Sequence, residues 1–307
     1  LTPWLINRTP RVPDCPTTDE PPSMPIPPAA PTDRGHQADP RLAILFMTAA
    51  MLAFAVMDIL SKQLVKTSAP LMVVWGIYVV QAAILLGAFA PRLPRLLATR
   101  RPWLQFLRAA ILVATSVCYV TGLALVPLAE AGAIVMLSPL AFTALAVPFL
   151  GERVGLRRWA GVIAGFVGAM IIIRPGSDAM QLAALWPLAA AVLHGLYQVV
   201  TSYVGRDDSV MTSMTCGILF CALIMTPIVP FHWSPLTPLQ WGLLGAAGVA
   251  GALAEYALIQ SLTRAPAAVV APYTYSYLLW SAAAGVILFG ERPDAWVWAG
   301  AGLIVAS

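Results

Sequence analysis

The chain has 307 residues, of which 59% are hydrophobic and only 10% are charged, and its mean hydropathy is +0.79. A soluble protein carries about 25% charged residues, so this composition excludes a soluble globular fold and indicates an integral membrane protein. The formal net charge of +4 does not indicate nucleic-acid binding, because the basic residues are scattered through short loops between apolar runs.

The first forty residues differ from the rest of the chain. They hold 5 of the 14 acidic residues and 11 of the 27 prolines, a composition that cannot bury enough apolar surface to offset the entropy of ordering. We therefore predict that residues 1–40 form a disordered cytoplasmic tail. They contain no basic start followed by an apolar run, so a signal peptide is not expected, and the missing initial methionine indicates a partial sequence.

Ten apolar segments follow the tail. A bilayer core of about 30 Å requires roughly 20 apolar residues per helix, and the alternating short strands of a membrane barrel are not found in this sequence. The tenth segment has 13 residues, about 20 Å of helix, so we expect the natural chain to continue a few residues further. The predicted spans are 42–62, 71–91, 103–126, 129–150, 155–173, 183–203, 211–230, 239–262, 267–289 and 295–307.

The distribution of basic residues predicts the orientation of these spans. With the amino terminus in the cytoplasm, twelve Lys and Arg residues fall on the inner side and four on the outer side, as the positive-inside rule requires. Ten spans return the carboxyl terminus to the cytoplasmic side. Arg108, near the inner end of the third span, is then expected to extend its side chain toward the cytoplasmic interface, and binding of a substrate carboxylate is the alternative.

An internal repeat divides the spans into two halves. A shift of 139 positions places Gly151-Glu152-Arg153 on Gly290-Glu291-Arg292, and Trp159-Ala160-Gly161 on Trp298-Ala299-Gly300. The predicted repeats, residues 41–175 and 180–307, each hold five spans, and the odd number inverts the second copy. Inverted repeats are typical of carriers that work by alternating access, although a duplication without functional meaning stays open. The Gly-Glu-Arg motifs are expected to cap helix ends and form loop ion pairs.

Two acidic residues lie well within the spans, Asp58 in the first and Glu255 in the eighth. A charge near the centre of a bilayer is costly, so such residues mark functional sites. We predict that they couple transport to protons or bind an amine. The alternative for Asp58 is a local ion pair with Lys62, four residues further along the helix.

The sixth span carries a polar stripe near the middle of the bilayer. His194, Tyr197, Gln198 and Thr201 are spaced to lie on one helical face, which we expect to contact substrate. Hydrogen bonding between helices is the alternative. The ninth span has Tyr273, Tyr277 and Trp280 at helical spacing, where rings can stack on a planar substrate or enclose a cation, or simply fill the bundle core.

Spans 3 and 4 complete the predicted site. Ser116 and Tyr119 lie at a similar depth in the third span, and the shift of 139 places Ser116 on Glu255. In the fourth span, Ser138-Pro139 is expected to break or kink the helix, because proline removes a backbone donor. The candidate substrate-binding residues are thus Ser116, Tyr119, Ser138, His194, Tyr197, Gln198, Tyr277 and Trp280, around a cavity between spans 1, 3, 4, 6, 8 and 9.

The four cysteines show no CxxC spacing, and no metal site, cofactor or catalytic role is predicted. The sequence has no HExxH, GxSxG or phosphate-binding glycine loop, and its loops are short, which argues against an intramembrane enzyme. A channel would be expected to show a carbonyl filter or a ring of charges, and neither is visible. Both classes are more distant alternatives to a carrier.

The paired motifs also indicate a family. The run from Pro139 through Gly151-Glu152-Arg153 to Trp159-Ala160-Gly161, and its partner from Ala271-Pro272-Tyr273 to Trp298-Ala299-Gly300, resemble the repeat ends of the EamA family in the drug/metabolite transporter superfamily. The resemblance implies a ten-helix inverted-repeat carrier of small metabolites in the bacterial inner membrane. It favours export of amino acids or related amines, as in the aromatic amino-acid exporters; uptake of a vitamin or nucleoside-like solute, such as riboflavin or S-adenosylmethionine, is the alternative. A monomer is expected, and a dimer stays open.

Overall fold

The computed structural model describes residues 39–151, 155–173, 180–205 and 207–306. Every regular element in these ranges is a helix, which confirms the predicted all-α class. Residues 1–38 of the predicted tail lie outside the described residues, so the disorder and the location of this part stay predictions, whereas Asp39 and Pro40 belong to the start of the first helix.

The first half of the chain forms five predicted spans, two of which are divided into shorter pieces. Asp39 caps the first helix, because its side chain accepts hydrogen bonds from the backbone N–H groups of Arg41 (3.1 Å) and Leu42 (3.2 Å). Three helices begin with proline, which has no N–H to leave unpaired in a first turn. The helices are α1 (Pro40–Leu64), α2 (Pro70–Phe89), η1 (Ala90–Arg92), α3 (Leu93–Leu96), α4 (Pro102–Leu125), α5 (Leu128–Val135), α6 (Ser138–Leu150) and α7 (Leu156–Ile173).

The second half repeats this order. Its longest helix starts at a capping box, in which the Thr237 hydroxyl accepts from the Gln240 N–H (3.3 Å) and the Gln240 side chain accepts from the Thr237 N–H (2.7 Å). The helices are α8 (Met180–Val204), α9 (Val210–Met225), η2 (Val229–His232), α10 (Pro238–Arg264), α11 (Ala267–Val270), η3 (Ala271–Tyr275), α12 (Ser276–Phe289) and α13 (Ala295–Ala306).

All ten predicted spans are present as helices in the described ranges. Seven helical stretches are long and apolar enough to cross a membrane by length and composition, and α9 and α13 are shorter apolar helices. The ninth span is divided among α11, η3 and α12. The fold is therefore that of a ten-helix integral membrane protein.

The fourth and ninth spans are interrupted at equivalent places. α5 ends at Val135 and α6 begins at Ser138 with Pro139 in its first turn, so the predicted break is confirmed. The shift of 139 carries Ser138 to Tyr277, and α12 begins one residue earlier. Broken helices of this kind are tolerated in a membrane where the freed backbone groups are buried in protein or line a cavity.

Both α6 and α12 end at a glycine with left-handed backbone geometry. Gly151 has φ of 69° and Gly290 has φ of 67°, and they are related by the same shift of 139. A residue with a Cβ atom is strained at such an angle, which explains why glycine begins each Gly-Glu-Arg motif. The predicted helix caps are confirmed at both glycines, whereas Glu152 and Arg153 lie outside the described residues.

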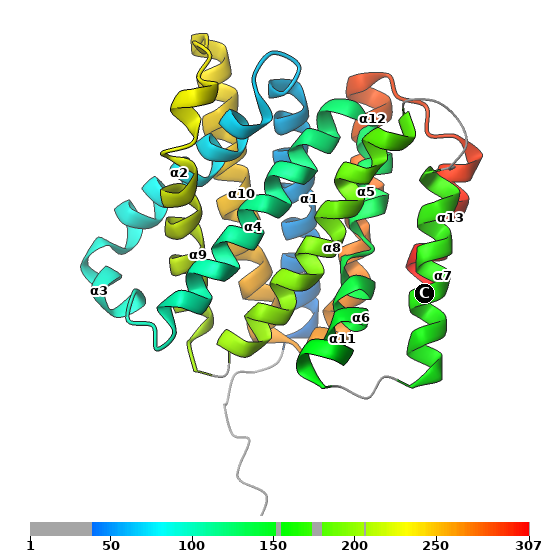
Figure 1. The fold of residues 1–307 in the computed structure, drawn as a ribbon, viewed down its shortest axis with the longest axis horizontal. Coiled ribbons are helices and arrows are strands. Elements are labelled where there is room, and N and C mark those ends of the chain that lie inside the picture. Colours follow the sequence, from blue (N-terminus) through cyan, green and yellow to red (C-terminus); the bar gives the residue numbers. More distant parts are fainter. Residues whose placement is uncertain (1–38, 152–154, 174–179, 206, 307) are drawn as a thin grey trace, which may run out of the picture. The chain divides into compact units, whose positions relative to one another are not determined.

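The two halves pack on each other through equivalent pairs of helices. α1 packs on α10, α4 on α8 and α7 on α13, so each of these pairs joins the first half to the second. Figure 1 shows α1 (blue) and α8 (light green) running in opposite directions, as inverted repeats require. Between α7 and α13 the backbones meet closely, because a Cβ atom at Gly168 would lie 2.8 Å from the Gly300 carbonyl oxygen.

A polar contact joins the loop before α4 to the loop before α9. Asp208 accepts hydrogen bonds from the Arg100 N–H (3.0 Å), the Gln105 Nε2 (2.9 Å) and the Thr99 hydroxyl. Burial alone would raise the pKa of Asp208, but these hydrogen bonds outweigh it and hold the pKa below its usual value of 3.8.

Because the folded-state pKa is lowered, the carboxylate stabilises the fold above the unfolded pKa and loses this effect as the pH falls through the folded value. We expect Asp208→Asn to lower the unfolding temperature at pH 7. The difference in unfolding temperature between the variant and the wild type should become smaller below pH 3.8. Thermal unfolding in detergent between pH 3 and 7 measures this. Asp207→Asn is the control, since its ion pair with Arg101 is largely exposed; a gap that is the same at every pH contradicts the prediction.

Candidate functional site

One face of α4 carries three polar residues along the bundle interior. They are Arg108, Ser116, which follows it by eight positions, and Tyr119, which follows it by eleven. This spacing places them on one stripe over about three helical turns. α4 packs on α8 and also contacts α1, α2 and α9. The stripe therefore meets side chains from both halves of the chain.

Arg108 does not extend to the cytoplasmic interface as predicted, because its side chain is held inside the bundle. The residue is only 2% exposed. Its Nη1 donates to the Tyr197 hydroxyl (3.0 Å), and its Nη2 donates to the Ser213 carbonyl oxygen. Gly217 on α9 makes room for it, since a Cβ atom there would lie 2.9 Å from Nη2. The partners on α8 and α9 hold the cation in the core.

Glu255 on α10 faces this arginine. The carboxylate interacts electrostatically with Arg108, and also with Tyr78 and Tyr197. It is partly exposed, and none of the described residues donates a hydrogen bond to it. The two charged groups form no ion pair within 4 Å in this part of the structure. The carboxylate therefore has unused capacity to accept a hydrogen bond.

Tyrosines surround the two charges. The Tyr78 hydroxyl on α2 is hydrogen-bonded to the Ser116 hydroxyl at 2.7 Å, and the Tyr197 ring lies 5.2 Å from the Arg108 guanidinium carbon. Ser116 and Glu255, which the shift of 139 relates to each other, thus lie at one site. We call the set Tyr78, Arg108, Ser116, Tyr197 and Glu255 the arginine cluster.

The rest of the polar stripe on α8 borders this cluster. The His194 ring packs against the Tyr197 ring at 5.5 Å between centroids. His194 and Gln198 are partly exposed, and among the described residues neither side chain has a hydrogen-bond partner. Thr201 instead donates to the Tyr197 carbonyl within its own helix (2.7 Å). Polar groups left unpaired at this depth are costly unless water or solute satisfies them.

Asp58 lies at a second site, which we call the aspartate cluster and define as Asp58, Tyr119 and Tyr277. Asp58 is 4% exposed, and its Oδ2 accepts from the Tyr277 hydroxyl (2.6 Å) and the Tyr119 hydroxyl (3.1 Å). The two hydroxyls are 2.6 Å apart. The cluster joins α1, α4 and α12, and Tyr119 lies one turn from Ser116 of the arginine cluster.

Lys62 is not the partner of Asp58, so the alternative of a local ion pair is wrong. Its Nζ lies 2.7 Å from the Glu291 Oε1 and donates to the Val126 carbonyl at 2.7 Å. The Glu291 Oε2 accepts from the Leu128 N–H at 2.8 Å. These four residues, the Lys62–Glu291 network, tie the end of α1 to the α4–α5 junction and to the residues after α12. The predicted loop ion pair of the second Gly-Glu-Arg motif is confirmed here.

The predicted aromatic stripe of the ninth span is not continuous. Tyr273 lies in η3, where it is 40% exposed, because the helix is interrupted before Tyr277. Tyr277 is buried, whereas Trp280 on α12 is 37% exposed. Ser138 is buried at the first residue of α6, which packs on α8. Of these four residues, only Tyr277 belongs to one of the two clusters.

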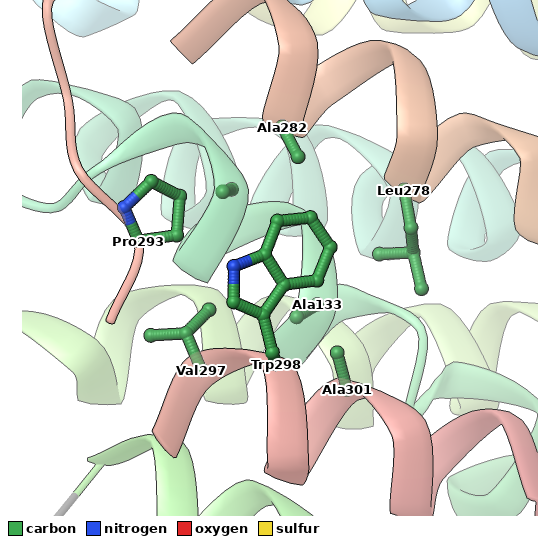
Figure 2. Close-up of a pocket in the computed structure, with 8 residues that line it drawn as sticks. Ala133, Leu278, Ala282, Pro293, Val297, Trp298 and Ala301 are labelled. Atoms are coloured by element: carbon green, nitrogen blue, oxygen red, sulfur yellow. The ribbon is translucent and has the colours of Figure 1, made fainter. Parts of the chain in front are cut away.

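A small apolar cavity lies elsewhere, between α5, α12 and α13. Figure 2 shows the lining side chains, with the Trp298 indole in the middle and Leu278, Ala282 and Pro293 around it. Its volume is about 20 Å³, enough for about one water molecule. The cavity has no charged lining residue, so we do not assign it a substrate.

Two members of the arginine cluster are not among the substrate-binding residues predicted from the sequence: Tyr78, which was missed, and Arg108, for which substrate binding was only the alternative. For Arg108 a signal existed, since it shares a helical face with Ser116 and Tyr119. Tyr78 stands alone in an apolar span, and nothing in the sequence pairs it with Ser116.

Comparisons with known proteins are consistent with this architecture. The profile of the EamA-like transporter family matches residues 41–174 and 181–307. A protein named riboflavin transporter from Rhizobium johnstonii is 36% identical over 214 residues, which are 68% of this chain and 70% of that protein. A protein named S-adenosylmethionine uptake transporter from Rickettsia bellii is 28% identical over 209 residues, 68% of this chain and 72% of that one.

A solved crystal structure has the same fold. It superposes with a TM-score of 0.59 and covers 86% of this chain and 94% of its own. At 21% sequence identity this likeness concerns the fold alone.

Proposed function

The chain belongs to the EamA-like transporter family, and from this premise we propose that it is a secondary carrier that takes up riboflavin, or a close relative of it, across the bacterial inner membrane. It is a multi-pass membrane transporter of a small molecule and not an enzyme. The relatives named for riboflavin and for S-adenosylmethionine uptake favour the uptake alternative over the amino-acid export expected from the sequence.

The observation that carries the substrate proposal is the 36% identity to the Rhizobium johnstonii riboflavin transporter. The chemistry of the arginine cluster is compatible with it. Arg108 and Glu255 balance in charge, so a neutral solute leaves no charge uncompensated. Tyr197 and His194 offer ring faces on which a planar heteroaromatic system can stack.

The proposed path runs between the two clusters. The residues proposed to contact the solute during its passage are the substrate-binding residues predicted from the sequence, with Tyr78, Arg108 and Glu255 added. The residues from the sequence are Ser116, Tyr119, Ser138, His194, Tyr197, Gln198, Tyr277 and Trp280.

Uptake into proteoliposomes tests the function. We expect saturable riboflavin influx and counterflow, in which internal unlabelled riboflavin accelerates entry of labelled riboflavin. Aromatic amino acids should not compete. Linear influx without counterflow indicates a pore. Influx of amino acids, with no influx of riboflavin, indicates that the substrate is an amino acid.

We also propose that Asp58 couples transport to protons. In the described spans Lys62 pairs with Glu291 and Arg108 faces Glu255, so Asp58 is a carboxylate with tyrosine donors and no cation. A proton that binds and leaves during the cycle would supply the missing positive charge.

Asp58→Asn should abolish riboflavin-driven proton flux while preserving riboflavin counterflow, because the amide cannot release a proton but can still accept from Tyr277. A pH-sensitive dye inside the liposomes measures the proton flux. Asp207→Asn, in an exposed loop, is the control. Unchanged proton flux in Asp58→Asn contradicts the coupling assignment.

A cationic solute is a second candidate, favoured by the same uncompensated carboxylate. The Rickettsia bellii relative is named for S-adenosylmethionine uptake, and a sulfonium or ammonium group could neutralise Asp58 in place of a proton. Competition between the two solutes decides the matter: saturable S-adenosylmethionine influx that riboflavin does not inhibit favours the cationic solute.

A further inference from the structure

Arg108 retains hydrogen-bonding capacity that the protein does not use. A guanidinium group has five N–H donors, of which the structure pairs one on Nη1 with Tyr197 and one on Nη2 with Ser213. The Nε atom is buried and has no partner among the described residues. These contacts hold the group in place while leaving donors for another acceptor.

Glu255 supplies a hydrogen-bond acceptor that complements the donors of Arg108. Its carboxylate can only accept, and in the part of the chain that the structure describes it receives no hydrogen bond, although it lies within electrostatic range of Arg108. The cluster thus presents a fixed donor group, Arg108, and a free acceptor group, Glu255, that do not pair with each other.

We propose that Arg108 and Glu255 recognise the imide edge of a flavin ring, with Glu255 accepting from the ring N3–H and Arg108 donating to a neighbouring ring carbonyl. This inference rests on the proposed function and adds the part of the substrate that is recognised. An imide has an N–H flanked by two carbonyls, so it presents a donor beside an acceptor on one rigid planar edge. The rest of the ring then lies toward Tyr197 and His194.

Phosphates and simple amines match the pair less well than an imide. A phosphate would place negative charge against Glu255, and a simple amine would place positive charge against Arg108. A zwitterionic amino-acid group would satisfy both residues, and the test below separates it from the imide. A site built to hydrogen-bond a polar group discriminates strongly against an analogue that lacks the group, because its own polar atoms are left unpaired.

The test compares riboflavin with N3-methylriboflavin, in which the N–H donor is removed. Binding to the purified wild-type protein is measured by quenching of flavin fluorescence, and transport by competition with labelled riboflavin. We expect N3-methylation to weaken binding about tenfold or more. An analogue altered at the dimethylbenzene end is the ligand control, and its effect should be the same in wild type and in every variant of Glu255.

Variants of Glu255 then assign the contact. Glu255→Ala should reduce the N3-methyl penalty to about twofold or less, because the acceptor is gone, whereas Glu255→Gln keeps a carbonyl oxygen and should keep most of the penalty. The wild-type comparison needs no variant, so a folding defect cannot obscure it. Riboflavin binding without an N3-methyl penalty, or inhibition by free zwitterionic amino acids in its place, overturns the imide assignment alone. Absence of any riboflavin binding overturns the proposed substrate as well.

Discussion

Replacing Lys62 with methionine should lower the free energy of unfolding by about 3 to 5 kcal/mol, because Glu291 would remain buried without its cation. The two side chains are only 10% and 13% exposed, and their closest atoms are 2.7 Å apart. Lys62 also satisfies the Val126 carbonyl, which would lose its donor. Gly285 lets the carboxylate sit against α12, since a Cβ atom there would lie 2.7 Å from the Glu291 Oε2.

The double variant Lys62→Met/Glu291→Gln should be less destabilised than the sum of the two single variants, because it leaves no uncompensated charge. Denaturant unfolding in detergent measures these differences. Lys66→Met is the matched control, because Lys66 is exposed and its Nζ lies 4.6 Å from the centre of the Phe289 ring, which the Lys62 Nζ also faces at 5.5 Å. Equal losses in Lys62→Met and Lys66→Met would show that the buried ion pair contributes nothing specific.

Replacing Arg108 with leucine should reduce riboflavin uptake about a hundredfold, the equivalent of losing roughly 2.7 kcal/mol of interaction with the solute. The change removes the cation that faces Glu255 and the donor to Tyr197. Arg108→Lys should recover only part of the activity, since an ammonium group does not reproduce the planar fork of a guanidinium group.

Two further variants separate binding from folding. Arg101→Leu removes an arginine from an exposed loop pair and should leave uptake close to wild type. Arg108→Leu/Glu255→Leu removes both charges and should unfold at a higher temperature than Arg108→Leu while remaining inactive. Normal uptake in Arg108→Leu would assign the residue to helix packing, with Tyr197 and Ser213 as its structural partners.

Much of the fold was predictable, because each span is a local property of composition. Runs of about 20 apolar residues can cross a bilayer only as helices, and the breaks follow proline and left-handed glycine positions. Ser138-Pro139 and the pair Gly151 and Gly290 show this, since all three features occur where the sequence placed them.

The side-chain partners were less predictable. Arg108 was placed on the right helix, but the expected direction of its side chain was wrong, because its partners lie on α8 and α9. Lys62 was paired with the nearest acid along its own helix, whereas the structure pairs it with Glu291 from the other half of the chain. Local spacing describes neighbours on one helix and contains no information on which helix packs against it.

By itself, therefore, the sequence determined the membrane class, the ten spans, the two inverted halves and the two intramembrane acids. Hydropathy and repetition follow from the order of the residues alone. Only the tertiary structure decided which groups meet. The Tyr277 hydroxyl reaches Asp58 across 219 positions and Arg108 reaches Tyr197 across 89. Such contacts depend on the packing of separate helices, where a buried charge is stable only beside the partner that the fold brings to it.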